Sequence, residues 1–218
     1  MALRRIGIYG GTFDPVHNGH LEVARQVQKL FELDQVMFVP AWVPPHKRNA
    51  KITSAFHRFA MLALATGQDQ NLHLSTVELD APDFPYAVET IERMKKDSAR
   101  LFFMIGADSW AEIPTWHEWR RLLQLCDLIV TTRPGYEIDQ APARETDLID
   151  LRNRDRNEIS EALANTNHPR VFVTNAVMMD ISATRIRAVA QAHDGPALRM
   201  MLPGAVAEYI EKYNLYGK

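Results

Sequence analysis

The stretch from Gly10 to His20 constrains this chain more than any other segment. It reads Gly-Gly-Thr-Phe-Asp-Pro-Val-His-Asn-Gly-His, follows a short apolar run at Ile6–Tyr9 and precedes a helical pattern that opens at Leu21. A glycine-rich turn between a strand and a helix is where α/β proteins bind phosphate, because backbone N–H groups and a helix N-terminus converge on the anion. His17 and His20 are three residues apart, so both imidazoles can face one point from the first helical turn.

The two common phosphate-binding templates do not describe this turn. No Lys-Ser or Lys-Thr follows the glycines, as a P-loop requires, and Gly10, Gly11 and Gly19 do not have the Gly-x-Gly-x-x-Gly spacing. The turn supplies histidines instead, and two such donors at one phosphorus favour stabilisation of charge during a transfer over simple anchorage. The alternatives are an ordinary Gly-Gly turn and a His-x-x-His metal pair. Zinc is disfavoured, since the chain has one cysteine and the sequence shows no third ligand near these histidines.

The composition is that of a globular protein, with 46% hydrophobic and 24% charged residues in a chain of 218. This length predicts one domain over 1–218, with a small helical portion at about 183–218. The net charge of −2 gives no support for nucleic-acid binding, and no stretch approaches a membrane span. Because the apolar run after Arg5 is too short for a signal peptide, we expect a cytoplasmic protein. Cys126 is expected in the core, and the oligomeric state stays open.

Strand-like and helix-like segments alternate along the chain. The strands are expected at Arg5–Tyr9, Gln35–Pro40, Leu72–Val77, Arg100–Ile105, Leu128–Thr132 and Val171–Thr174. Helical patterns carry Leu21, Ala24, Val27 and Phe31, then Phe56, Phe59, Ala60, Leu62 and Ala63, then Val88, Ile91 and Met94, and continue at Glu158–Ala164, Ala183–Gln191 and Gly204–Tyr213. The alternation predicts an α/β protein with a Rossmann-like, doubly wound parallel sheet and helices on both faces. Ligands bind beyond the carboxyl ends of such strands, so the first loop should border the site.

A second candidate phosphate site follows the last expected strand. Ser182 is a good N-cap, Thr184 falls in the first helical turn and Arg187 lies about one turn further along. Arginine binds phosphate through a two-pronged fork. The alternative is a purely structural role, in which Ser182 caps a helix and Arg187 lies on the surface. Together with the first motif, we expect two helix N-termini at the ends of neighbouring strands to clamp a polyphosphate.

Three further stretches combine turn residues with functional side chains. A stiff loop after the second strand offers cationic donors at His46, Lys47 and Arg48. Gly106 and Asp108 end the fourth strand, where a carboxylate can hold a ribose diol. Trp116 lies in a proline-preceded turn and is predicted to stack on a flat ring, whereas Trp119 is expected in the core.

These residues resemble the nucleotidyltransferase α/β-phosphodiesterase superfamily and, within it, the bacterial nicotinate-nucleotide adenylyltransferase family. The shared pattern is Gly-x-Phe-x-Pro-x-His-x-Gly-His with a distal Ile-Ser-x-Thr-x-x-Arg, and the similarity runs almost end to end. It also includes Pro-Pro-His-Lys at 44–47, Phe84-Pro85-Tyr86 with Thr90, Gly-Ala-Asp-Ser at 106–109 and Pro-Thr-Trp at 114–116. The first and last motifs indicate the reaction type, and the middle stretches indicate the acceptor.

The resemblance implies that ATP and nicotinate mononucleotide give deamido-NAD and pyrophosphate, with Mg²⁺ on the triphosphate held mostly by phosphate and water. It implies that His17 and His20 are catalytic. It assigns ATP binding to Gly10, Gly11, Thr12, Phe13, Gly106, Asp108, Ser182, Thr184 and Arg187. It assigns nicotinate-mononucleotide binding to His46, Lys47, Tyr86, Thr90, Trp116 and His117, with Trp116 stacked on the pyridine. No metal ligand among the side chains is expected.

Rival functions remain open at this stage. Many relatives carry an aromatic residue where this chain has His117, which leaves the contact from that position open. An adenylyltransferase for nicotinamide mononucleotide or phosphopantetheine would share the outer motifs, although Trp116 favours a flat pyridine over a pantetheine arm. A cytidylyltransferase is less favoured, because such domains are usually shorter. A non-catalytic nucleotide sensor is the alternative from another class, and we would expect it to lack His17, His20 or Arg187.

Overall fold

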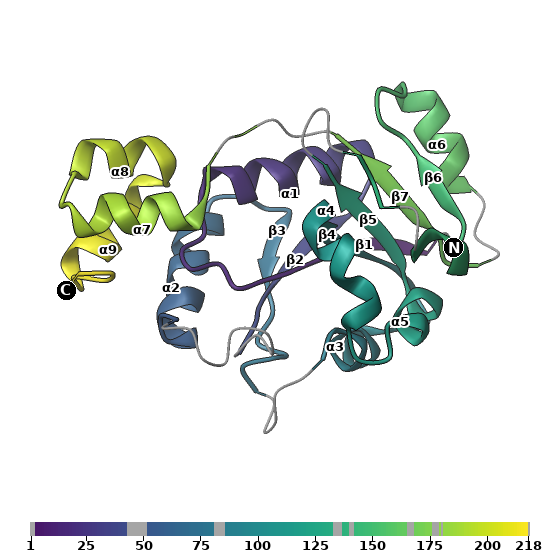
Figure 1. Ribbon diagram of the computed structural model, residues 1–218, viewed down its shortest axis with the longest axis horizontal. Coiled ribbons are helices and arrows are strands. Elements are labelled where there is room, and N and C mark those ends of the chain that lie inside the picture. The colour runs from purple at the N-terminus through teal and green to yellow at the C-terminus, as the bar shows by residue number, and fades with distance from the viewer. Residues whose placement is uncertain are drawn as a thin grey trace.

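A seven-stranded parallel sheet forms the centre of the described part of the chain. The computed structural model describes residues 3–42, 52–80, 86–132, 137–139, 142–164, 168–175, 179 and 181–217. The strands lie in the order β3-β2-β1-β4-β5-β7-β6, and every neighbouring pair is parallel (Figure 1). Their bounds are β1 Arg4–Gly11, β2 Gln35–Pro40, β3 Leu72–Leu74, β4 Ala99–Gly106, β5 Asp127–Thr131, β6 Leu148–Asp150 and β7 Val171–Thr174. The predicted doubly wound α/β fold is confirmed.

Helices cover both faces of this sheet, as expected. One face carries α1 (Asn18–Leu30), α2 (Ala55–Thr66) and α6 (Arg156–Ala164), and the other carries α3 (Ala87–Met94), α4 (Ala107–Glu112) and α5 (Trp119–Leu125). Strand residues alternate between two cores: in β4, Phe102 and Met104 belong to the first, and Phe103 and Ile105 to the second. Such strands are apolar on both sides because neither face meets water.

The chain closes with α7 (Ala183–Gln191), α8 (Gly195–Met201) and α9 (Gly204–Lys212), which lie together at one end beside α1 and α2 (Figure 1). The sequence predicts two helices here and misses α8, because Gly195-Pro196 is typical of a turn. Proline is tolerated in the first turn of a helix, and Asp194 caps α8 by accepting from Ala197 N at 3.1 Å. The apolar side chains of these helices join the core around α1. The prediction of a single domain stays a prediction.

Three other local predictions differ from the structure. β3 ends at Leu74 instead of Val77, because Thr76 turns the chain away: its carbonyl and its hydroxyl both bond Asp80. The short strand β6 forms between β5 and α6, where the sequence analysis expects no strand. In α2, Phe56 is 68% exposed, although the apolar pattern places it in the core, while Arg58 is 0% exposed.

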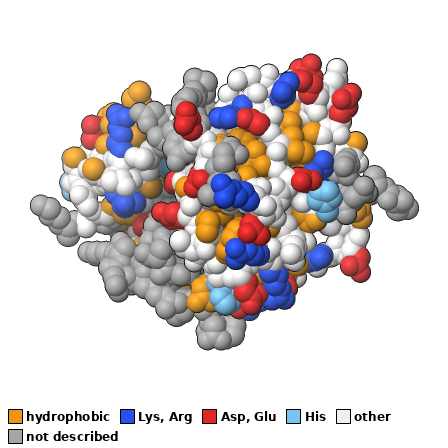
Figure 2. All heavy atoms as spheres, turned by 45° about the vertical axis from the view of Figure 1, so that its right-hand side comes forward, with side chains coloured by type: hydrophobic (Ala, Val, Ile, Leu, Met, Phe, Trp, Pro, Cys, Tyr) orange, Lys and Arg blue, Asp and Glu red, His pale blue; other side chains and the backbone are white. Residues whose placement is uncertain are grey.

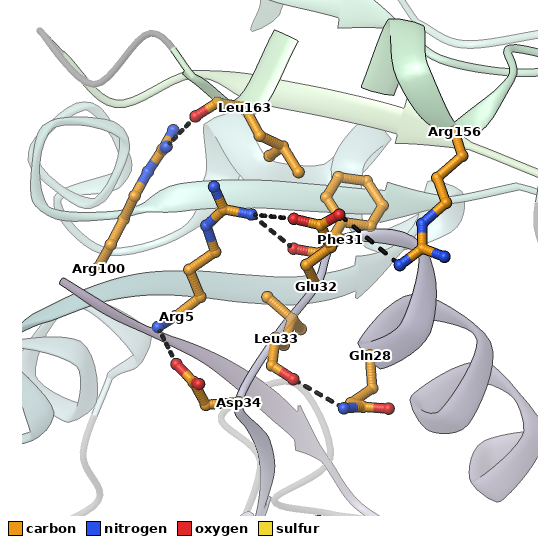
Figure 3. A network of polar contacts seen from close by, with 9 residues as sticks. All are labelled: Arg5, Gln28, Phe31, Glu32, Leu33, Asp34, Arg100, Arg156 and Leu163. Carbon is orange, nitrogen blue, oxygen red and sulfur yellow. Dashed lines mark hydrogen bonds and ion pairs between the residues drawn. The ribbon is translucent and has the colours of Figure 1, made fainter. Parts of the chain in front are cut away.

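A polar network fixes the amino-terminal edge of the sheet, where α1 turns into β2 (Figure 3). Arg5 bonds Glu32 at 3.1 Å through its guanidinium, and its backbone N–H donates to Asp34 at 2.7 Å. Arg156 adds a longer ion pair to Glu32 at 3.7 Å. These contacts fix the position of the start of β1. They lie at the opposite end of the strands from the carboxyl edge, where ligands bind in such sheets.

The surface is of mixed charge. On the face drawn in Figure 2, Lys and Arg side chains are interspersed with Asp and Glu and do not gather into one basic field. Within the described residues, none of the helices has the length and apolar character that crossing a membrane requires.

Candidate active site

A cavity of ≈ 1220 Å³ opens at the carboxyl edge of the sheet, over the ends of β1 and β4. This is where the strand order reverses, because β2 lies on one side of β1 and β4 on the other. Its lining includes fourteen residues predicted for the site: Gly10, Gly11, Thr12, Phe13, His17, His20, Tyr86, Thr90, Gly106, Asp108, Trp116, His117, Ser182 and Arg187. Segments far apart in the sequence therefore share one cavity. His46 and Lys47 lie outside the described residues.

The two histidines cap the first turn of α1 reciprocally. His17 is the N-cap and His20 is the third helical residue. Nδ1 of His17 accepts from His20 N at 3.4 Å, and Nδ1 of His20 accepts from His17 N at 3.2 Å. The imidazoles stack, with ring centroids 3.6 Å apart and planes 23° apart. The predicted convergence of both rings at the start of this helix is confirmed.

This cap also determines which nitrogen of each ring carries the proton. A nitrogen that accepts a backbone hydrogen bond has no proton of its own, so each neutral imidazole is protonated at Nε2. Burial lowers the pKa of His17 to about 4. Burial, and then the neighbouring His17, lower the pKa of His20 well below its ordinary value. Near neutral pH the site therefore presents two stacked, uncharged rings, each with an Nε2–H donor.

Glycine and aromatic residues shape the pocket around these rings. Phe13 has a φ of 48° and lies edge-on to His20, with centroids 5.1 Å apart. A Cβ on Gly11 would lie 2.9 Å from the Phe13 ring, so a side chain there would displace it. A Cβ on Gly19 would lie 3.0 Å from Nδ1 of His17. The glycines of the motif thus allow close packing around the histidines.

The second helix N-terminus also reaches the cavity. Ser182 caps α7 by accepting from Arg185 N at 3.3 Å. Arg187 donates to the Asp14 carbonyl at 2.9 Å and to Thr184 Oγ1 at 3.2 Å. Thr184 is absent from the described cavity lining, so its hydroxyl contacts Arg187 and not the open space.

One expectation about this N-terminus is wrong. β1 and β7 are not neighbouring strands, since β4 and β5 lie between them. The two N-termini nevertheless meet, and a Cβ on Gly19 of α1 would lie 3.8 Å from Cβ of Ile181. The chain after β7 therefore returns along the carboxyl edge to bring α7 beside α1.

Asp108 lies at the end of β4, as predicted. Gly106 is the N-cap of α4, and a Cβ there would lie 2.5 Å from Oδ1 of Asp108, so the carboxylate folds back over the glycine. Ser109 N donates to the same oxygen at 2.9 Å. Burial, with a contribution from Asp108, raises the pKa of Tyr9 far above its ordinary value.

Aromatic side chains line another part of the cavity. The rings of Tyr86 and His117 lie 4.4 Å apart with an interplanar angle of 32°, and Trp116 lies edge-on to Phe103 at 6.3 Å. Trp119 is buried in the core, as predicted. Trp116 is partly buried and lines the cavity, and its stacking on a flat ring stays a prediction. His117 thus adds its imidazole ring beside Tyr86 to this part of the lining.

The sequence analysis missed Glu78, which also lines the cavity. Thr90 donates to its carboxylate at 2.9 Å. Burial raises the pKa of Glu78 to about 7, while the bonds from Thr90 and the Trp42 backbone act in the opposite direction. The sequence shows only a glutamate a few residues before the Phe84–Tyr86 stretch, and this signal is too weak to predict a partly buried acid in the site.

Replacing Glu78 by glutamine is expected to stabilise the protein selectively at higher pH. The folded protein holds a proton on Glu78 up to a pH of about 7, whereas the unfolded chain releases it near 4.5. The stability linked to this proton is complete below pH 4.5 and is lost as the pH rises through 7. The free energy of unfolding of Glu78→Gln, relative to the parent protein, should therefore rise by up to about 3 kcal/mol between pH 4.5 and pH 8.

Urea unfolding of both proteins at the two pH values measures this change. His17 and His20 titrate in both proteins, so their contributions cancel in the difference. A difference in stability that does not vary with pH would contradict the prediction.

Among the described residues, no three His, Cys, Asp or Glu side chains gather in a way that could hold a metal ion. The cavity instead offers neutral histidines, Arg187 and two helix N-termini, which together suit a polyphosphate.

Comparison with known proteins agrees with this geometry. A model of the cytidylyltransferase-like family matches residues 8–189. The chain is 37% identical over 217 residues to the probable nicotinate-nucleotide adenylyltransferase of Thermoanaerobacter sp. (strain X514), covering 98% of this chain and 95% of that protein. It is 36% identical to the protein of the same name in Desulfatibacillum aliphaticivorans, covering 97% and 99%.

A solved structure shares the fold. The Plasmodium falciparum nicotinic acid mononucleotide adenylyltransferase complexed with NaAD matches 98% of this chain and 97% of its own at a TM-score of 0.74 and 19% identity. This match shows a shared fold. The sequence relatives show the family, because they are 36–37% identical over nearly the whole of both chains. The chain belongs to the nicotinate-nucleotide adenylyltransferase family.

Proposed function

We propose that this protein transfers AMP from ATP to nicotinate mononucleotide, giving deamido-NAD and pyrophosphate, as a step in NAD biosynthesis. The observation that carries the proposal is one cavity lined by a histidine pair, by a second helix N-terminus with Arg187, and by a group of aromatic side chains. The chain is also related over nearly its whole length to probable nicotinate-nucleotide adenylyltransferases. Its volume, ≈ 1220 Å³, exceeds that of a typical pocket for one small molecule and can receive two nucleotides together.

The reaction requires no nucleophilic side chain. A phosphate oxygen of nicotinate mononucleotide attacks the α-phosphorus of ATP, a P–O bond forms, and the bond from that phosphorus to the oxygen bridging to the β-phosphate breaks to release pyrophosphate. The task left to the protein is alignment and stabilisation of negative charge. Nε2–H of His17 and of His20 would donate to the α-phosphate oxygens, and the backbone of Gly10, Gly11, Thr12 and Phe13 would line the phosphate channel.

The remaining groups divide between the nucleoside and the leaving group. Ser182 and Arg187, with Thr184 orienting the guanidinium, would hold the β- and γ-phosphates at the N-terminus of α7. Gly106 and Asp108 would face the adenosine, where a carboxylate accepts from ribose hydroxyls. Mg²⁺ bound to the triphosphate would neutralise its charge, and phosphate oxygens and water suffice as its ligands.

The acceptor would lie against the aromatic part of the cavity. Trp116 would stack on the pyridine ring, and backbone N–H groups near Tyr86 and His117 would receive its carboxylate. Thr90 would support this subsite through its bond to Glu78. His46 and Lys47 would lie near the acceptor phosphate.

The test is pyrophosphate release from ATP and Mg²⁺ with nicotinate mononucleotide and nicotinamide mononucleotide as parallel acceptors. We expect kcat/KM to favour the acid by at least about 100-fold, roughly 2.7 kcal/mol, because an amide cannot replace a carboxylate at a set of N–H donors. Equal rates would exclude the acid as the preferred acceptor. Activity with phosphopantetheine alone, or binding of ATP with no acceptor used, would contradict the proposal.

A further inference from the structure

Asp14 is a buried carboxylate beside the catalytic loop, and the reaction outlined above gives it no role. It is 6% exposed, lines the cavity and stands three residues before His17. A carboxylate so far from solvent requires donors. Both of its oxygens have one: Thr53 N donates to Oδ2 at 3.3 Å, and the Tyr216 hydroxyl donates to Oδ1 at 2.8 Å.

Tyr216 reaches Asp14 from the segment that follows α9, 202 positions further along the chain. Burial, together with the charge of Asp14, raises the pKa of its phenol far above the ordinary value, so the hydroxyl keeps its proton and donates it. Leu215 and Tyr216 pack against the core around α1, which fixes the ring.

The same residue is held on its backbone side. Arg187 donates to the Asp14 carbonyl at 2.9 Å, so α7 and the segment after α9 restrain one residue through different atoms. Only Pro15 and the fully buried Val16 separate Asp14 from His17. With so short a connection, a displacement of Asp14 carries the His17 cap with it.

We propose that Tyr216 is a positioning residue for AMP transfer: its bond to Asp14 holds loop 12–17 so that His17 and His20 meet the α-phosphate. The inference rests on the proposed function. Without the hydroxyl, the Asp14 carboxylate loses a donor and the loop gains freedom, while the phenyl ring still packs against the core. Tyr216→Phe is therefore expected to lower kcat by about tenfold to a hundredfold, with KM for both substrates within about threefold, because loss of alignment affects the transition state most.

Tyr209→Phe is the matched control. It also removes a hydroxyl near the end of the chain, on α9, where Tyr209 bonds Nδ1 of His57 at 2.9 Å, away from the cavity lining. We expect its kcat to equal that of the parent protein. Asp14→Asn gives a second readout: if Tyr216 acts through Asp14, adding Tyr216→Phe to Asp14→Asn should cost less than adding it to the parent protein.

A measurement without substrate separates the two proposals. Histidine ring ¹H–¹³C spectra, with His17 and His20 assigned by single replacements, should shift in Tyr216→Phe and not in Tyr209→Phe. The inference is overturned if kcat of Tyr216→Phe stays within twofold of the parent, or if Tyr209→Phe loses as much. If the parent protein makes no dinucleotide, the proposed function fails, and the spectra still decide: shifted rings support a role of Tyr216 in holding the loop, and unchanged rings overturn it.

Discussion

His20→Ala is expected to lower kcat by about 10²–10³-fold, and His17→Ala by a similar factor. Each change removes one Nε2–H donor from a buried site in which charge develops on the α-phosphate, and the loss of one such donor typically costs roughly 3–4 kcal/mol of transition-state stabilisation. His17→Ala also removes a helix cap, worth about 1 kcal/mol of stability, which leaves the protein folded. Steady-state pyrophosphate release at saturating substrates measures the effect, with thermal unfolding as the check on folding.

The predicted tautomer gives a sharper version of the same experiment. The amide nitrogen of glutamine can occupy the position of Nε2, whereas that of asparagine falls near Nδ1. Because the donor is Nε2–H, His20→Gln should retain more activity than His20→Asn. His73→Ala serves as a control, since His73 is exposed on β3 and outside the cavity lining. A kcat for His20→Ala within about threefold of the parent protein would remove this residue from the mechanism.

The sequence predicts what is local. The eleven residues from Gly10 to His20 contain the turn, the cap and both histidines, so their spacing suffices to predict the meeting of the two rings. The same holds for Ser182, whose N-cap role follows from its place before α7. Strand positions follow from short apolar runs, and the parallel sheet follows from their alternation with helices.

Contacts between segments that are distant in the sequence cannot be predicted from such local patterns. No pattern in the sequence connects Asp14 with Tyr216 or Thr90 with Glu78, since these pairs form only after the sheet brings their segments to one edge. The order of the strands is also non-local, which is why α1 and α7 were expected on neighbouring strands. Helical periodicity misassigns α2 because it ranks residues by apolar character: Phe56 faces solvent and packs on Trp42, while the charged Arg58 is buried.

Of the replacements proposed for this protein, Arg58→Met is expected to lower the free energy of unfolding most. The guanidinium of Arg58 donates to four backbone carbonyls: Thr53 at 2.9 Å, Thr12 at 2.6 Å, Ala41 at 2.6 Å and Trp42 at 2.9 Å. It thereby ties the loops that follow β1 and β2 to the start of α2. Methionine fills much of the volume and donates nothing, so carbonyls at the cavity edge lose a charged donor at a cost of about 1–3 kcal/mol for each that stays unsatisfied.

Allowing for water at some of these carbonyls, we expect the free energy of unfolding to fall by about 4 kcal/mol and Tm by roughly 10 °C in a chain of this size. Arg58→Lys should lie in between, because an ammonium has three donors and no planar fork. The control is Arg25→Met, which breaks a 3.0 Å surface ion pair with Asp69 and should cost at most about 1 kcal/mol. Urea unfolding of the three variants measures the order. Equal stabilities of Arg58→Met and Arg25→Met would mean that these carbonyls bind water as readily as arginine, and that Arg58 does not organise the loops of the site.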